Sequence, residues 1–418
     1  MLFRSDDAEG RFNYLGGGSW ESTRNLLRSG SDGFFPWVIV ASIAPRRLIY
    51  AHEFAWDRER DPVWRRLEKI FAWHGVPEHL ASTHGFGRVT LRPPEASHCN
   101  NIGPVQRKSI HEALEKWFGI RATEFSKPIE SAELACFAPE LRERLHPRPA
   151  HEIYTQLGAS RAAAFRAKLV PLPVTERRSL LQAEWTKLLG PVTPKASAPV
   201  QQREPGKFGD ARVGRFVIET EPGILVPVML LLPSAKSATR PPLVVGLAQS
   251  GGAKFLSDRS DAVKALLQGG VAVCLPDLRG TGESSPEGSR DRQTEATSLS
   301  ATELMLGATM LGARLRDLRA VLAHLRTLAD VDASRVALWG DSFAPVNTPG
   351  FADPLIGEGA TPHQSEPLGG LLALFGAIFE PDVKAIAARG LFAGFQSLLQ
   401  NTFCYVPHDA VVPGALTA

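Results

Sequence analysis

Apolar runs recur along the second half of the chain, with stretches of helical periodicity between several of them. The runs have the lengths and the β-branched content of buried strands. They are RVGRFVIET, ILVPVMLLLP, PLVVGLA, GVAVCLPD, RVALWG and VKAIAA, all within residues 209–418. Because strands that alternate with helices form parallel sheets covered on both faces, this block is predicted to be an α/β domain with a mainly parallel sheet.

The first block, residues 1–120, shows a shorter version of the same pattern. Residues 47–51 suit a buried strand, and the segment DPVWRRLEKIFAWHG that starts at Asp61 has apolar residues at helical spacing. A second strand is predicted around GRVTL, residues 87–91, followed by a loop. The segment VQRKSIHEALEKWFG, residues 105–119, places its apolar residues on one helical face. This block is thus predicted to contain strands and helices in alternation.

A polar segment, residues 121–208, lies between the two blocks. Its sequences PAHEIYTQLGASRAAAFRAKL and TERRSLLQAEWTKLLG predict helices. The run PVTPKASAPVQQREPGKFGD that follows contains Pro, Gln and Ser but no apolar period, which is typical of a linker. We therefore expect a helical connector that ends in a linker.

Composition excludes several classes of function. The net charge of +3 over 418 residues is small and the basic residues are interspersed with acids, which argues against a nucleic-acid partner. The cysteines (Cys99, Cys136, Cys274, Cys404) lie far apart, so neither a disulfide framework nor a zinc site is indicated. The N-terminus has no apolar core of a signal peptide, and no stretch reaches the ~18 apolar residues of a membrane span. We expect a soluble chain with no metal, no organic cofactor and no membrane partner.

Three turns that follow predicted strands contain residues suited to chemistry. Gln249-Ser250-Gly251-Gly252 can present backbone N–H groups to an anion. Asp277 and Arg279, after the next strand, are expected to hold their turn through a structural ion pair rather than to act in catalysis. Ser342 in VALWGDSF follows a strand at a turn that would lift its hydroxyl clear of the sheet, where it could attack a carbonyl. Ser342 is therefore the candidate nucleophile.

In this order, the glycine-rich turn, DLRGTGES and RVALWGDSF resemble the oxyanion strand, the following strand and the nucleophile strand of the α/β-hydrolase superfamily. The segment looks most similar to bacterial carbohydrate esterases related to acetyl xylan esterases, and to dienelactone-hydrolase-like enzymes. Two departures stand out: Ala344 replaces the last glycine of the G-x-S-x-G pattern, and residues 345–367 delay the helix that should begin at the serine. Ser365 in HQSEPLGG is nearer to that helix but has no strand before it, so it ranks below Ser342.

The resemblance implies an acid and a histidine after the serine, yet the residues there offer only His408 and Asp409, which are adjacent and thus poorly placed for a triad. The matching segments stand upstream instead. APRRLIYAHEF resembles the acid-bearing strand, which makes Asp57 the candidate acid with Glu53 as the alternative. EASHCNNIGP resembles the loop before the last helix, which makes His98 the candidate base.

The blocks therefore stand in inverted order: residues 1–120 resemble the C-terminal portion of a hydrolase domain and residues 209–418 its N-terminal portion. Either the chain is a circular permutant, or it is cut from a tandem pair of domains. Each half would leave a sheet edge exposed, so the halves are expected to pair within one chain or, by exchange, between two.

The leading hypothesis is a serine hydrolase that cleaves an acyl ester of a carbohydrate, with Ser342 as nucleophile, His98 as base and Asp57 or Glu53 as acid. The backbone N–H of Phe343 and one from Gln249 or Ser250 would form the oxyanion hole. Two alternatives stay open. The chain is an inactive hydrolase-like binding module or an incomplete fragment, or the same scaffold serves a serine peptidase.

Overall fold

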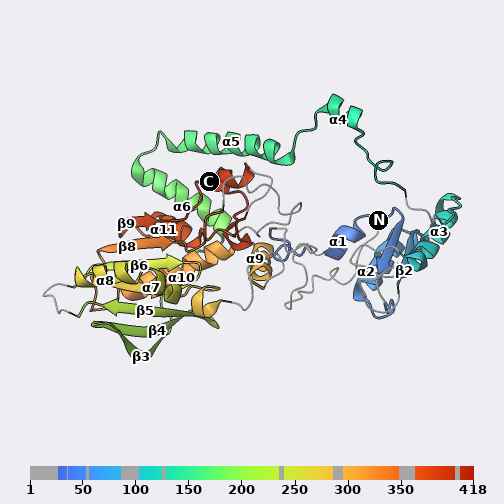
Figure 1. The fold of residues 1–418 in the computed structure, drawn as a ribbon. Helices are drawn as coiled ribbons and strands as arrows, with labels where there is room; N and C mark the ends of the chain where they lie inside the picture. The colour runs from blue at the N-terminus through green and yellow to red at the C-terminus, as the bar shows by residue number, and fades with distance from the viewer. Residues whose placement is uncertain are drawn as a thin grey trace. The chain divides into compact units, whose positions relative to one another are not determined.

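The computed structural model divides the chain into two compact units, Met1–Pro147 and Arg148–Ala418, each described here by itself (Figure 1). The structure describes residues 27–34, 36–52, 56–85, 103–124, 129–234, 240–285, 295–347, 363–400 and 405–418.

The N-terminal unit is built around two parallel strands, in which Leu48 pairs with Leu80 and His52 with His84. Its elements are α1 (Pro36–Ala41), β1 (Leu48–His52), α2 (Pro62–Trp73), the short 3-10 helix η3 (Pro77–His79), β2 (Leu80–His84), α3 (Pro104–Phe118) and α4 (Pro139–Leu145). Leu48 and Tyr50 of β1 are fully buried in one apolar cluster with α1 and α2.

The sequence predicted most of this unit. The strand at residues 47–51 and the two helices are confirmed as β1, α2 and α3. Strand β2 was missed because LASTH is short, mixed in polarity and mostly half-buried, so it carries no periodic signal. The strand predicted around GRVTL falls on residues 87–91, which lie outside the described part of the chain.

The C-terminal unit contains a seven-stranded sheet in the order β3-β4-β5-β7-β6-β8-β9. Its strands are β3 (Val200–Phe208), β4 (Ala211–Glu221), β5 (Ile224–Leu232), β6 (Leu243–Ala248), β7 (Ala272–Pro276), β8 (Val336–Asp341) and β9 (Val383–Ala388). All six strands predicted from the apolar runs are present. Because β3, β4 and β5 join the sheet in antiparallel fashion and only β7, β6, β8 and β9 run parallel, the sheet is mixed rather than mainly parallel.

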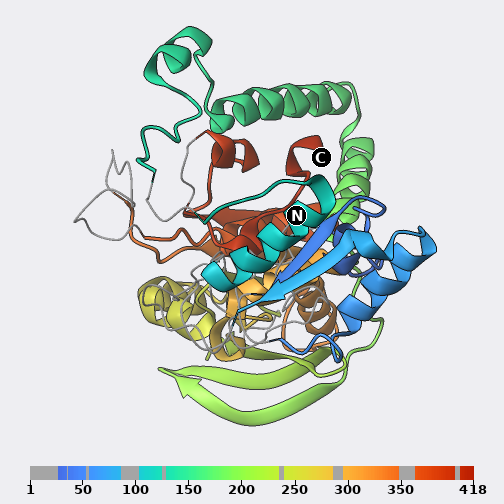
Figure 2. The ribbon, with the colours of Figure 1, turned by 90° about the vertical axis from the view of Figure 1, so that its right-hand side faces the viewer.

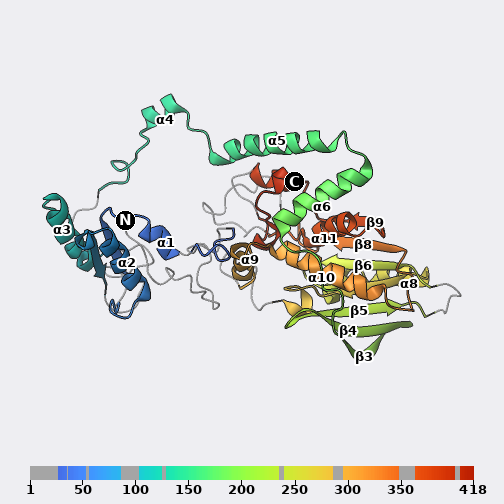
Figure 3. The ribbon, with the colours of Figure 1, turned by 180° about the vertical axis from the view of Figure 1, so that it is seen from behind.

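Helices cover both faces of this sheet (Figures 1 and 3). The helices of this unit are α5 (Ala150–Leu169), α6 (Val174–Leu189), α7 (Gly252–Asp258), α8 (Ser260–Gln268), α9 (Glu295–Met305), α10 (Met310–Leu325) and α11 (Leu368–Phe379). Of these, α6, α10 and α11 pack against one face of the sheet and α7 and α8 against the other. Alternate residues of a strand enter opposite clusters: Leu230 packs with α6, α10 and α11, whereas Leu231 packs with α7 and α8. This alternation is the period of two expected for strands buried on both faces.

The boundary between the units falls within the predicted connector: residues 121–147, with α4, belong to the N-terminal unit, and residues 148–208 belong to the C-terminal unit. Thr155 of α5 donates a hydrogen bond to the Leu399 carbonyl (2.7 Å), and Gln182 of α6 donates one to Ile378 (2.8 Å). The linker prediction is wrong for Val200–Phe208, because this segment forms β3 and pairs with β4 in the long hairpin at the lower edge of Figure 2. Its side chains are mostly exposed, so backbone pairing holds a strand that shows no apolar period.

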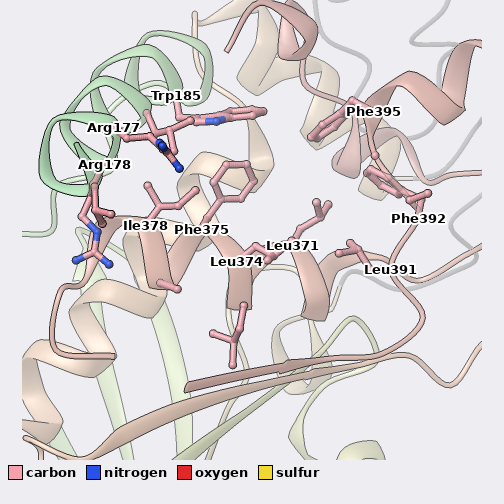
Figure 4. Close-up of a pocket in the computed structure, with 16 residues that line it drawn as sticks. Arg177, Arg178, Trp185, Leu371, Leu374, Phe375, Ile378, Leu391, Phe392 and Phe395 are labelled. Atoms are coloured by element: carbon pink, nitrogen blue, oxygen red, sulfur yellow. The ribbon is translucent and has the colours of Figure 1, made fainter. Parts of the chain in front are cut away.

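Strand β9 forms the opposite edge of the sheet and pairs with β8. Its sequence, VKAIAA, is that of an interior strand, yet residues 384–388 are exposed. An apolar cavity of about 540 Å³, which we call groove A, lies beside it between α6 and α11, where Trp185 and Phe375 meet edge to face at 4.7 Å (Figure 4). A second apolar cavity of about 510 Å³, groove B, lies between α8 and residues 385–387. The edge strand is thus flanked by open apolar grooves.

Within the described residues, no helix combines the length and the apolar character that crossing a bilayer requires. The same part of the chain holds no group of three or more His, Cys, Asp or Glu side chains arranged to bind a metal ion.

Candidate active site

The candidate site lies where three parallel strands end together. Ala248 of β6 pairs with Asp341 of β8, and Gly340 of β8 pairs with Ala388 of β9. The residues that follow these strands therefore leave the sheet at the same edge and in register. In open α/β sheets this carboxyl edge is where ligands bind.

Two glycines bring β8 against the start of α11. A Cβ atom on Gly340 would lie 2.1 Å from the Gly369 carbonyl oxygen, and one on Gly369 would lie 2.2 Å from that of Leu247. No real side chain tolerates such distances, so both positions require glycine. Ala344 stands where the G-x-S-x-G pattern has its last glycine, and the close approach of strand and helix is made by Gly340 and Gly369, the latter beyond the inserted segment. The Gly-Gly pair in EPLGG was the available signal for it.

Ser342 is half-buried and directly follows β8. Its N–H donates to the Asp341 carboxylate at 2.9 Å. The turn is not strained, since the non-glycine residues with positive φ in the described chain are Arg28 and His146. Helix α11 begins only at Leu368, as the sequence predicted, so Ser342 does not stand at a helix N-terminus. The sharp strand-to-helix turn expected around the nucleophile is therefore absent at Ser342 itself.

A second backbone segment holds the Ser342 side chain. Gly390, which follows β9 in a left-handed conformation (φ 72°), lies so close that a Cβ there would be 2.3 Å from the Ser342 Cβ and 2.9 Å from its Oγ. The neighbouring Arg389 N–H donates to the Gly340 carbonyl at 2.9 Å, which fixes this loop against β8.

A buried carboxylate supports the serine. Asp341 is fully buried and accepts two hydrogen bonds from Arg259, at 2.6 and 3.1 Å. The hydrogen bond to Asp341 is the main reason that the pKa of Arg259 lies above its usual value. The guanidinium of Arg259 also lies 5.0 Å from the centre of the Phe343 ring, a cation–π distance. Sequence analysis missed Arg259, because nothing in its surroundings signals a contact with a residue far along the chain.

The backbone N–H of Phe343, predicted as an oxyanion donor, is already used in the structure. It donates to Oε2 of Glu366 at 3.0 Å. The Phe343 ring packs edge to face against Phe255 at 6.0 Å, so the residue is held from both sides. Sequence analysis did not single out Glu366.

The glycine-rich turn after β6 is tied to the turn after β7. Oδ1 of Asp277 accepts the Gly252 N–H at 2.6 Å, and Oδ2 accepts the Glu283 N–H at 2.9 Å. A Cβ on Gly251 would fall 2.3 Å from the Cα of Gly282, so the two turns touch. Gln249 is 1% exposed, and the buried hydroxyl of Ser250 has no hydrogen-bond partner among the described residues. The predicted structural role of Asp277 agrees with these bonds to backbone N–H groups, although its partners are not ionic.

The predicted ion pair between Asp277 and Arg279 is wrong, because Arg279 pairs with carboxylates from other parts of the chain. Its guanidinium contacts Asp317 at 2.7 Å and also Glu221. Burial alone would lower the pKa of Arg279, but the bonds to these carboxylates outweigh it and raise the pKa.

His408 and Asp409 do not form a catalytic pair. Asp409 is buried and accepts a hydrogen bond from Arg314 at 2.8 Å, while Nδ1 of His408 lies 3.0 Å from the Ser300 hydroxyl. Burial lowers the pKa of His408, partly offset by the charge of Asp409. The rival serine, Ser365, precedes α11, and its N–H donates to the Tyr405 carbonyl at 2.8 Å.

The upstream candidates belong to the N-terminal unit. Asp57 is exposed and lies 3.3 Å from Arg60. His98 and Glu53 lie outside the described residues. The same unit contains a buried histidine, His52, whose ring stacks on Trp56 at 4.0 Å and whose Nε2 lies 3.8 Å from Asp61, the N-cap of α2.

Comparison with known proteins gives only distant likenesses. No protein-family profile and no curated protein matches the chain. Among solved structures, it is similar to a Bacteroides fragilis protein described provisionally as an acetyl xylan esterase (14% identity, TM-score 0.39, 51% of this chain and 52% of that one). It is also similar to a glucuronoyl esterase from Solibacter usitatus (16%, 0.35, 53% and 60%). An acetyl xylan esterase from a Thermoanaerobacterium species is a further match (15%, 0.30, 51% and 62%).

These structural neighbours are thus carbohydrate esterases, and the chain matches about half to three fifths of their length. At such identities and TM-scores, the likeness assigns neither a family nor an activity to this chain.

Proposed function

We propose that this chain is a serine hydrolase that cleaves a carboxylic ester, an acyl ester of a carbohydrate, through an acyl-enzyme. The observation that carries the proposal is the position of Ser342 at the carboxyl end of β8, in register with the glycine-rich turn after β6 and backed by the buried Asp341–Arg259 pair. The substrate class rests on the sequence resemblance to carbohydrate esterases.

In the proposed reaction, Ser342 Oγ attacks the acyl carbon while His98 accepts the hydroxyl proton. His98 then passes this proton to the leaving alcohol as the C–O bond breaks, and water hydrolyses the acyl-serine by the same steps. Asp57 or Glu53 would hold the imidazolium. The N–H of Phe343 and one from Gln249 or Ser250 would bind the oxyanion.

This mechanism requires the acid and histidine segments to reach the edge of the sheet where Ser342 lies. The exposed edge of β9, flanked by grooves A and B, supports a further parallel strand at that position. We propose that the acid and histidine segments, with Asp57 or Glu53 and His98, pair with the nucleophile half at an exposed sheet edge of this kind. The pairing is proposed either within one chain or by exchange between two.

Two variants test the proposal. Ser342→Ala and His98→Ala should each abolish hydrolysis of p-nitrophenyl acetate, and a fluorophosphonate probe should label the unmodified chain at Ser342. Unchanged turnover in Ser342→Ala would refute the nucleophile. Mixing the two inactive variants should restore activity if the halves exchange between chains, and should not restore it if they pair within one.

An inactive binding module is the second candidate. The unstrained backbone at Ser342 and the occupied Phe343 N–H favour it. A folded sample that the probe fails to label would support this candidate against the hydrolase.

A further inference from the structure

The backbone N–H of Phe343 is hydrogen-bonded to a side chain of the same protein. In the reaction proposed above, this N–H would stabilise the negative oxygen that forms as Ser342 attacks an ester. In the structure it donates to a carboxylate oxygen, Oε2 of Glu366, at 3.0 Å. A carboxylate oxygen resembles the oxyanion in charge and in its preference for backbone N–H donors. The two acceptors would therefore compete for one donor.

Hydrogen bonds fix the backbone on the N-terminal side of Glu366. Asn347 and His363 are tied together by two hydrogen bonds, Asn347 Nδ2 to the His363 carbonyl (2.8 Å) and the His363 N–H to Asn347 Oδ1 (2.7 Å). This pair joins the two described residues that stand before and after residues 348–362. The Ser365 N–H is bound to the Tyr405 carbonyl (2.8 Å).

Glu366 itself stands two residues before α11, whose first turn is locked against β8 at Gly369. The N-terminus of this helix favours a nearby negative charge. Two cations lie beside the Phe343 ring, Arg259 at 5.0 Å and Lys254 at 5.9 Å from its centre. Each cation is paired with an aspartate, Arg259 with Asp341 and Lys254 with Asp258. The Glu366 carboxylate is thus held by a fixed backbone next to a helix N-terminus.

We propose that Glu366 is an internal competitor of the substrate: its carboxylate occupies the oxyanion position at the Phe343 amide and must leave before Ser342 can react. This inference rests on the proposed hydrolase function. The direction in which Ser342 reactivity changes when Glu366 is removed distinguishes a competitor from a residue that only supports the turn. A residue that only braced the turn would lower the reactivity of Ser342 when removed, whereas a competitor raises it.

The test compares Glu366→Ala and Glu366→Gln with the unmodified chain. The readouts are the rate of fluorophosphonate labelling at Ser342 and kcat/KM for p-nitrophenyl acetate. A hydrogen bond to a charged acceptor is strong enough that its loss should raise both rates roughly 10- to 100-fold in Glu366→Ala. Glu366→Gln should fall between, because an amide oxygen still accepts the Phe343 N–H but carries no charge. Glu204→Gln, an exposed glutamate of β3 at the far edge of the sheet, is the matched control and should change neither rate.

Rates in Glu366→Ala equal to or below those of the unmodified chain would overturn the inference. Hydrogen exchange at the Phe343 amide separates this failure from that of the proposed function. The amide should exchange faster in Glu366→Ala. If it does, while neither protein is labelled at Ser342, the contact is real but Ser342 is not a nucleophile, which refutes the proposed function and the competition with it.

Discussion

The Asp341–Arg259 pair beneath the candidate nucleophile gives a quantitative prediction. Asp341 is fully buried, while the Arg259 side chain is 22% exposed and binds it through two nitrogens. Replacing Arg259 by methionine keeps most of the side-chain volume but leaves the carboxylate buried without its counter-charge. Replacing Asp341 by asparagine removes the charge and still leaves an oxygen that can accept the Ser342 N–H.

The structure sets the expected sizes of these effects. Breaking a buried ion pair from one side costs ~3–5 kcal/mol, and the partial exposure of Arg259 lowers the expected cost of Arg259→Met to about 2–3 kcal/mol. Asp341→Asn should cost only about 1–2 kcal/mol, because Arg259 can turn to water. In the double variant the uncompensated carboxylate no longer exists. The double variant should therefore cost about 1–2 kcal/mol less than the sum of the single changes.

Native-state hydrogen exchange of the peptide that covers β8 and Ser342 measures these differences locally, without requiring the two units to unfold together. Arg259→Met should accelerate exchange there roughly 30- to 150-fold. Additive effects, with a coupling below about 0.5 kcal/mol, would refute the view that Arg259 acts by neutralising Asp341.

Three further predictions follow from packing and burial. Gly369→Ala should destabilise the C-terminal unit in thermal unfolding, since its Cβ would lie 2.2 Å from the Leu247 carbonyl, whereas Gly214→Ala, with 3.9 Å of clearance in β4, should not. Cys274 is fully buried with a pKa raised by burial, so iodoacetamide should modify the exposed Cys136 in the native protein and Cys274 only after unfolding, as peptide mass spectrometry would show. Burial lowers the pKa of His408 from 6.5, so the unfolded chain takes up this proton first and stability should fall as the pH drops below about 6.5. In urea titrations at pH 7 and pH 5, His408→Gln should lose less unfolding free energy between the two pH values than the unmodified chain. An equal loss in both proteins would contradict the lowered pKa of His408 as its cause.

The sequence predicted the parts of the fold that depend on local pattern. Long apolar runs identified β4 to β9: β6 and β7 are apolar because they are buried on both faces, whereas β9 has an apolar sequence although it is exposed. It missed β3, which is polar and exposed and is held by backbone hydrogen bonds that any side chain permits. It also gave the sheet as mainly parallel, because strand direction depends on pairing and not on composition.

In the candidate site, too, the sequence predicted the residues that follow a local pattern and missed those that depend on long-range contacts. Ser342 and the glycine-rich turn were found because both directly follow strands. Gly369, Arg259 and Glu366 were missed because their roles arise only when distant segments meet: the inserted residues separate Gly369 from the serine, and the other two act through single long-range contacts. Such contacts leave no periodic trace in the chain.

The composition of β9 also bears on how the protein behaves at high concentration. Within the described sheet, β9 pairs with β8 on one side only, and its other side presents backbone groups between apolar side chains, which is the geometry that seeds aggregation. Lys384 is the single charged residue in VKAIAA, and it acts as the gatekeeper of this edge. Wherever the edge is left uncovered, this ammonium group is the charge within the strand that opposes such assembly.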